Sequence, residues 1–400
     1  MLSKNSILIL AAIVLLGGVL FYSLRGKPAK APQFSLALDV NAPHLAWKFK
    51  NDRTFFANLT LGSDGTIYGS SNQGIIAVSP DGNLKWHAQY GSLSYTAMGS
   101  DGILYAAEMH GLIFGVSPDG TVSWKPGYGL IGFHAPPAIG GRSTVLFANT
   151  TADLYAFEQG SATAAWSQNT FREGAVGDNY GLPGSARVGA NNASSPVVYS
   201  DDSIALPRQR WLQMFSADGT PTWNLELTPG NLGIASLGED GTVYVADDRS
   251  MLYAVDHSGA MSWEFEADDV VAGSPVVDAD GVLYFTTARS VYALDRTGAV
   301  KWQVTPKHTG NSTPTLAADG SIYISAADGL FALNPDGTEK WSVQAPGGGT
   351  PPSISADGTV YFVCAMWICA VEGIHSPLMK SPWPRIYHDS GNTGNVLTQF

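Results

Sequence analysis

A unit of about 39 residues recurs along most of this 400-residue chain, and each copy contains short apolar runs separated by tight turns. One clear copy spans residues 272–302 and reads AGSPVVDADGVLYFTTARSVYALDRTGAVKW. The apolar runs are too short and too regularly interrupted for amphipathic helices. Repeats of this length, with four short strands each, are typical of β-propeller blades. The repeat therefore constrains the architecture more strongly than any other feature of the chain.

Eight tryptophans recur with the period of the repeat, and they indicate eight copies of the unit. Successive tryptophans are separated by 39, 38, 42, 57, 40, 39 and 39 residues. One tryptophan at a fixed place in every unit indicates packing between blades and not a platform for stacking sugars. These residues are Trp47, Trp86, Trp124, Trp166, Trp223, Trp263, Trp302 and Trp341.

Asp-Gly pairs such as Asp280-Gly281 separate strands A and B of a unit, and a second turn separates strands C and D. Asp-Gly tolerates the positive φ angles of tight hairpins. The eighth unit has no tryptophan near Met379, whereas Trp47 precedes the first Asp-Gly pair. We therefore expect the N-terminal strand to complete the eighth blade by pairing near Ile368, which leaves no open sheet edge. The predicted fold is all-β, an eight-bladed propeller of four-stranded antiparallel blades.

Residues 7–24 carry no charge and are long enough for a transmembrane helix. No small-residue cleavage pattern precedes Arg25, so an uncleaved anchor is favoured over a cleaved signal. Lys4 lies before the segment, and Arg25, Lys27 and Lys30 follow it. The positive-inside rule would keep the larger charge cluster in the cytoplasm, whereas an export signal would send it out, so charge leaves the orientation open.

These features divide the chain into four parts. They are an anchor or uncleaved signal at 1–25, a linker at 26–43, the propeller at 44–375 and a C-terminal tail at 376–400.

The repeat resembles the pyrroloquinoline-quinone-like propeller repeat, as in the stretch from Ala293 to Trp302. The tail, with Trp383-Pro384, Asp389 and Thr393-Gly394, resembles a segment that often flanks such propellers. The resemblance implies one of two classes. Some members are quinoprotein dehydrogenases that bind the quinone and calcium at the centre of the ring, and others are cofactor-free scaffolds of the barrel-assembly type.

The resemblance to the quinone enzymes is incomplete, because they carry an adjacent cysteine pair and this chain has only Cys364 and Cys369. The sequence also contains no Cys-x-x-Cys-His haem motif and no histidine pair with metal-ligand spacing. We therefore expect no catalytic residue, metal or cofactor, with pyrroloquinoline quinone plus calcium as the alternative. Cys364 ends one predicted strand and Cys369 begins the next, so we expect them to face each other across a hairpin, where buried free thiols are favoured and a disulfide is the alternative.

The connections at one end of the blades are uniform hairpins, whereas the B–C and D–A connections at the other end vary. The interval from Trp166 to Trp223 is 57 residues, and it holds an insertion at 167–193. Long loops on a rigid scaffold often carry binding residues, although a tolerated surface excursion is the alternative. The candidate partner- or ligand-binding residues in or near this insertion are Tyr128, His134, Phe171, Arg172, Tyr180, Arg187, Arg208, Arg210 and Arg249.

The net charge of −12 argues against a nucleic-acid-binding protein, which needs a basic surface. We expect a non-catalytic, monomeric propeller with a single-pass anchor in the cytoplasmic membrane, placed on the periplasmic or extracellular side. Its expected partner is a protein or a cell-envelope component. The alternative function is a small-ligand or quinone-binding propeller, such as a quinoprotein oxidoreductase.

Overall fold

The computed structural model describes residues 43–50, 59–90, 94–108, 110–126, 135–141, 143–149, 153–169, 194–227, 230–345 and 347–395. The expected anchor and nearly all of the linker lie outside these ranges. Within them, no helix has the length and apolar character that a membrane crossing requires.

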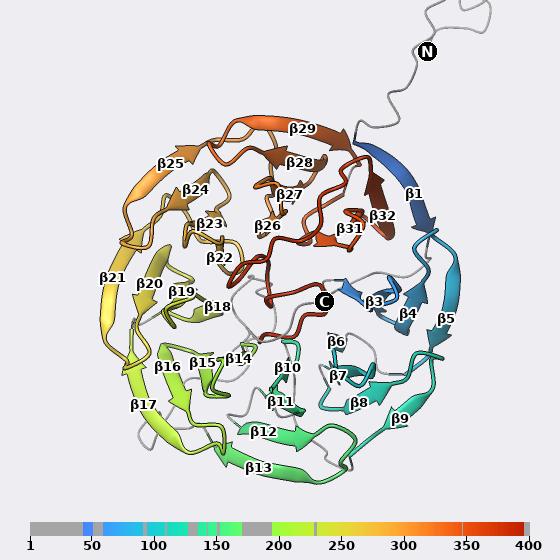
Figure 1. Ribbon diagram of the computed structural model, residues 1–400, viewed down its shortest axis with the longest axis vertical. Coiled ribbons are helices and arrows are strands. Elements are labelled where there is room, and N and C mark those ends of the chain that lie inside the picture. Colours follow the sequence, from blue (N-terminus) through green and yellow to red (C-terminus); the bar gives the residue numbers. More distant parts are fainter. Residues whose placement is uncertain are drawn as a thin grey trace, which may run out of the picture. The chain divides into compact units, whose positions relative to one another are not determined.

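Eight four-stranded antiparallel sheets are arranged as blades around a common centre (Figure 1). The predicted eight-bladed propeller is therefore confirmed. Blades one to seven are β2–β5, β6–β9, β10–β13, β14–β17, β18–β21, β22–β25 and β26–β29, and blade eight combines β30–β32 with β1.

The strands of the first half are β1 (His44–Lys50), β2 (Thr60–Leu61), β3 (Ile67–Ser71), β4 (Gly74–Val78), β5 (Leu84–Ala88), β6 (Ser94–Met98), β7 (Leu104–Glu108), β8 (Ile113–Val116), β9 (Val122–Trp124), β10 (Ala138–Ile139), β11 (Thr144–Ala148), β12 (Asp153–Glu158), β13 (Ala164–Asn169), β14 (Val197–Val198), β15 (Ile204–Arg208), β16 (Trp211–Phe215) and β17 (Pro221–Glu226). Those of the second half are β18 (Leu232–Leu237), β19 (Val243–Asp247), β20 (Met251–Val255), β21 (Met261–Glu266), β22 (Val276–Val277), β23 (Leu283–Thr286), β24 (Val291–Leu294), β25 (Val300–Val304), β26 (Thr315–Leu316), β27 (Ile322–Ala326), β28 (Gly329–Leu333), β29 (Glu339–Gln344), β30 (Ser353–Ile354), β31 (Val360–Cys364) and β32 (Trp367–Glu372).

The ring is closed by the N-terminal strand β1, which forms the outer strand of blade eight. It pairs antiparallel with β32, so that Trp47 lies opposite Ala370 and Phe49 opposite Ile368. This is the pairing expected from the isolated tryptophan at the start of the repeats. Because strands from both ends of the propeller share one sheet, the first and last blades are held together by a full set of strand contacts.

Each blade buries its middle strands against its neighbours, which explains the continuous apolar runs in the sequence. In blade one, every residue of β3 and β4 is buried, whereas only one residue of the outer strand β5 is. Both faces of a middle strand contact another blade, so strict alternation of polar and apolar residues is unnecessary. The core is therefore divided into layers that lie between adjacent blades.

The repeated tryptophans join neighbouring blades through the C–D turn of the next blade. The indole N–H of Trp47 donates to the carbonyl oxygen of Pro80 at 3.0 Å. The same turn places Gly82 against the indole, where an added Cβ would lie 2.8 Å from the ring. Trp86 repeats both contacts with the turn that holds Pro118 and Gly120. The fixed offset between glycine and tryptophan in the repeat thus reflects a contact between blades.

Cys364 and Cys369 form a disulfide across the hairpin of β31 and β32. The buried free thiols that we favour from the sequence are not what the structure contains. The two strands are adjacent in an antiparallel pair, with Cys369 opposite Phe362, and this brings the two Cα atoms to 6.0 Å. That separation lies in the range that a disulfide spans. The bond ties together two strands of the blade that closes the ring.

Candidate functional site

The C-terminal tail runs from the end of β32 into the centre of the ring (Figure 1, red). Since β1 already forms the outer strand of blade eight, the chain after Glu372 has no strand to add there. It crosses blade seven instead, where Ala318 N–H donates to the Pro377 carbonyl at 2.8 Å and Met379 N–H donates to Leu316 at 2.9 Å. The tail therefore forms no strand of blade eight and contacts other blades instead.

The inner strands of six blades each donate a backbone N–H to a carbonyl of the tail. The donor is in every case the last residue of strand A, next to the A–B turn. The pairs are Leu61 to Ser390 (2.7 Å), Met98 to Gly391 (2.8 Å), Ile139 to Thr393 (2.8 Å), Val198 to Gly394 (2.8 Å), Val277 to Trp383 (2.7 Å) and Leu316 to Pro384 (2.8 Å). We call this side of the ring the A–B face. The tail closes the channel mouth on that face.

Buried polar side chains hold the tail in place. The guanidinium of Arg385 is fully buried and donates to Asn392 Oδ1 at 2.7 Å, to Ser353 Oγ at 3.0 Å and to the Asp389 carbonyl. Asn392 Nδ2 in turn donates to Thr60 Oγ1 at 2.7 Å. Burial lowers the pKa of Arg385 to about 10, and the nearby Asp389 opposes that shift. The network joins the tail to blades one and eight, which are the two blades on either side of the closure.

The residues at this mouth do not fit a quinone and calcium site. Trp383, Arg385 and Asn395 of the tail are buried there, so the chain itself fills the space. Asp389 accepts a hydrogen bond from Thr393 Oγ1 at 2.7 Å. In the described ranges, no three acidic, histidine or cysteine side chains gather in a geometry that could hold a metal ion.

The opposite side of the ring, here called the B–C face, carries the B–C turns and the D–A connections. Most of the sequence-predicted binding residues belong to connections outside the described residues. These are Tyr128, His134, Phe171, Arg172, Tyr180 and Arg187. The structure consequently says nothing about six of the nine candidates.

The other three candidates lie at the B–C ends of blades four and five. Arg208 is buried and donates to the Asn149 carbonyl of blade three at 3.2 Å, so this side chain joins two blades. Arg210 is half-buried and its guanidinium lies 3.5 Å from the carboxylate of Glu226. Arg249 is exposed in the next B–C turn. Two of the three therefore have a cationic side chain at the B–C face that is at least partly exposed.

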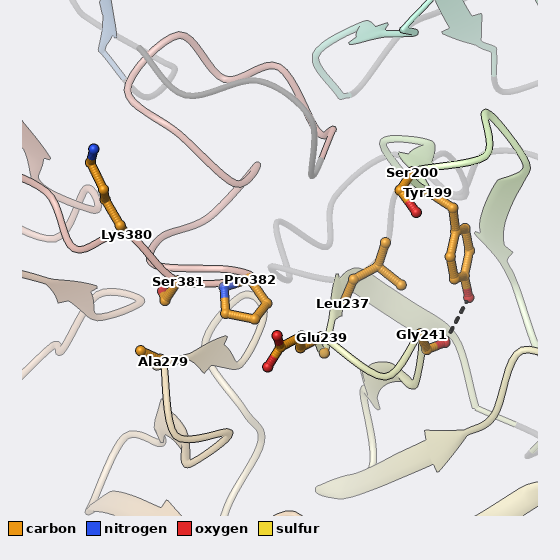
Figure 2. A pocket seen from close by; sticks show the side chains of 10 residues that line it. Tyr199, Ser200, Leu237, Glu239, Gly241, Ala279, Lys380, Ser381 and Pro382 are labelled. Carbon is orange, nitrogen blue, oxygen red and sulfur yellow. Dashed lines mark hydrogen bonds between the residues drawn. The ribbon is translucent and has the colours of Figure 1, made fainter.

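Sequence reasoning missed a cavity of about 470 Å³ on the A–B face (Figure 2). It lies among the A–B turns of blades four, five and six and residues 380–382 of the tail. The Asp-Gly turns alone do not predict this cavity, because residues 380–382 of the tail form one of its walls. The lining residues are Tyr199, Ser200, Leu237, Gly238, Glu239, Gly241, Ala279, Lys380, Ser381 and Pro382.

A serine and a histidine lie beside one of these turns, but their geometry is not that of an activated nucleophile. Ser203 Oγ donates to Asp201 Oδ1 at 2.6 Å, and His257 Nε2 is farther away at 3.3 Å. The proton therefore points to a carboxylate of its own turn. Thr66 and Asp64 form the same contact at 2.7 Å in blade one, so the serine belongs to the turn motif of the repeat.

The comparisons with known proteins agree with the ring and the repeat. Residues 208–345 and 248–371 match the family model described as outer membrane protein assembly factor BamB. Over these residues the repeat is of the pyrroloquinoline-quinone-like propeller type. No curated protein sequence matches the chain.

Solved structures share the fold at low sequence identity. BamB from Moraxella catarrhalis is 16% identical with a TM-score of 0.59, and the match covers 81% of this chain and 99% of that one. The computationally designed Ika8 protein is 9% identical with a TM-score of 0.64, covering 82% and 98% of the two chains. The C-terminal WD40 domain of Sif2 is 10% identical with a TM-score of 0.64, covering 82% and 97%. At these identities the likeness concerns the fold alone.

Proposed function

We propose that this protein is a non-catalytic scaffold, held by its N-terminal segment at the outer side of the cytoplasmic membrane. It binds a protein or cell-envelope partner through the B–C face. The observation that carries this proposal is the difference between the two faces. The tail closes the channel on the A–B face, whereas β13 ends at the B–C face and the insertion predicted at 167–193 continues from it in the sequence.

Two features support a place outside the cytosol. The uncharged segment at 7–24 is long enough to serve as an anchor. The disulfide between Cys364 and Cys369 is of a kind that persists in oxidising compartments and is rare in the cytosol. No cysteine other than these two is present, so we infer that the anchor is the segment itself and not a lipidated cysteine.

The family description supports a partner-binding role. The matched model is that of an outer membrane protein assembly factor, and the structure named BamB covers most of the ring. A fold of this kind hosts many activities, so the role of this chain must be argued from its own surfaces. Arg210 and Arg249 fit such a surface, because arginine combines contact area with directional hydrogen bonds at interfaces.

Photo-crosslinking of the full chain in its host cell tests the proposal. A photoreactive residue at Arg249 should give a discrete adduct, whereas one at Lys301, exposed on the outer strand β25, should not. Deleting residues 174–190 should abolish the Arg249 adduct without changing the melting temperature. If the deletion unfolds the protein, Arg210→Glu replaces it as the surface variant. Equal adducts at both positions, or adducts that survive all of these changes, would contradict a partner surface on the B–C face.

Calorimetric titration with pyrroloquinoline quinone and calcium tests the alternative function. We expect no binding to the full-length protein, because the tail fills one mouth of the channel. Tight binding with a raised melting temperature would overturn the scaffold proposal, since a ligand that binds only the folded state stabilises it.

A further inference from the structure

Blade five departs from the pattern that ties the inner strands to the tail. Six inner strands donate the N–H of their last residue to a tail carbonyl, and blade eight is contacted through Ser390 Oγ, which donates to the Ile354 carbonyl at 2.7 Å. Across the described residues, β18 forms no hydrogen bond with the tail. Its last residue, Leu237, is equivalent to the six donors by its place before the A–B turn.

Leu237 lines the cavity on the A–B face. Leu237 occupies the same position in its blade as the six donors occupy in theirs. Its N–H therefore points in the same direction as theirs, toward the centre of the ring where they bind tail carbonyls. The cavity therefore presents, next to the tail, a backbone donor of the kind that this ring already pairs with extended chain. Its volume of about 470 Å³ lies within the usual range of binding pockets.

The charged groups around the cavity favour a cation. Figure 2 shows the carboxylate of Glu239 directed toward Pro382 and Ala279, whereas the ammonium of Lys380 points away from them. Glu239 and its neighbour Asp240 are both exposed. A second cavity of about 290 Å³ adjoins the same turn, with Glu239, Asp240 and Arg296 among its lining residues. Arg296 already donates to the Asp280 carbonyl at 2.8 Å.

We propose that this cavity binds an extended peptide segment of a partner protein that carries a lysine or arginine. A backbone carbonyl of that segment accepts the Leu237 N–H, as tail carbonyls do in six other blades. The basic side chain lies against Glu239. This mode of recognition takes affinity from main-chain hydrogen bonds and specificity from one side chain. The site is on the face opposite the proposed partner surface, so its failure would leave the proposed function standing.

The test uses the full-length protein and a short probe, acetyl-Ala-Val-Arg-Val-Ala-amide, with a second peptide that has glutamate in place of arginine. We expect the arginine peptide to bind and to slow hydrogen exchange of the Leu237 amide at least tenfold. Glu239→Gln should weaken its binding about fivefold, which is the upper end for an exposed ion pair. Glu264→Gln, an exposed substitution on β21 of the same blade, should leave the affinity unchanged.

Three results would overturn the proposal. The first is equal affinity for the two peptides, or no binding of either at about 1 mM. The second is binding of the arginine peptide without slower exchange at Leu237. The third is a marked gain of affinity in a variant that ends at Asn395, which would show that the last residues of the chain compete for the cavity and that a partner peptide is not its resident occupant.

Discussion

Six of the repeat tryptophans pack on a glycine that must both adopt a positive φ angle and leave room for the indole ring. Gly82 has φ +84° and lies under the indole of Trp47, where a Cβ would come within 2.8 Å of the ring. Gly102, in an A–B turn, has φ +78° but no atom within 4 Å of the place of a Cβ. The two positions share the backbone requirement and differ only in the contact with tryptophan.

This pair allows the contact between blades to be measured. Gly102→Ala should lower the free energy of unfolding by about 1 kcal/mol, because a left-handed residue is strained when it carries a Cβ. Gly82→Ala should cost about 2 kcal/mol more, the usual cost of overpacking a filled site. Denaturant unfolding of both variants gives the difference. Equal losses would mean that the indole moves aside without cost and that the fixed spacing of glycine and tryptophan has another cause.

Arg385 is the clearest residue that the sequence did not reveal. Its partners, Ser353 and Asn392, lie 32 and 7 residues away, and Asn392 reaches Thr60 across 332 residues. No local pattern predicts such contacts, because they depend on how the tail returns to the centre. The tryptophans and Asp-Gly turns were predictable for the opposite reason, since each acts within one repeat or between adjacent repeats.

Removing the Arg385 side chain should therefore be costly. Arg385→Ala leaves the buried Asp389 without the nearby guanidinium and the hydroxyl of Ser353 without its donor, so we expect a loss of about 3 kcal/mol in unfolding free energy. Lys380→Ala, an exposed substitution in the same tail, should change it by less than about 0.5 kcal/mol. Urea titration distinguishes the two. A loss of similar size in both variants would indicate that the buried network adds nothing specific.

At the scale of elements, the closing blade is held by the pairing of β1 with β32 and by the disulfide between β31 and β32. The pairing was predictable, because Trp47 stood before the first repeat and the last repeat had no tryptophan at its end. The state of the two cysteines was not, since a hairpin places them close together in either case. Compartment chemistry and not strand geometry decides between thiols and a disulfide.

The disulfide closes a short loop, so its contribution to stability should be modest. The chain-entropy estimate for a loop of this size is about 2 kcal/mol. Replacing both Cys364 and Cys369 by alanine should lower the melting temperature, and a reductant should lower that of the parent protein by a similar amount. The double variant serves as the control and should not respond to the reductant. A parent protein that also fails to respond, with thiols that titrate freely, would show that the bond does not form.

At the scale of the whole molecule, the repeat predicted the ring, its blade number and its closure, but not what fills its centre. Periodicity reports what all blades share, and the tail belongs to no blade. The same limit applies to the cavity beside Leu237, because the described part of the tail forms hydrogen bonds with seven blades and none with blade five. The insertion at 167–193 was recognisable as a break in the period. Most of its residues lie outside the described part of the chain.

The tail should stabilise the inner strands of the blades that it contacts, and hydrogen exchange of their amides can show this for each blade separately. In a variant that ends at Pro382, the amides of Leu61, Met98, Ile139 and Val198 lose their carbonyl acceptors and should exchange at least tenfold faster. The amide of Leu237 has no tail acceptor among the described residues, so its exchange should hardly change and provides an internal control. If all five amides accelerate together, the tail stabilises the ring only globally. If none does, the channel mouth holds without the tail, and the closed A–B face on which the proposed function rests would lose its structural basis.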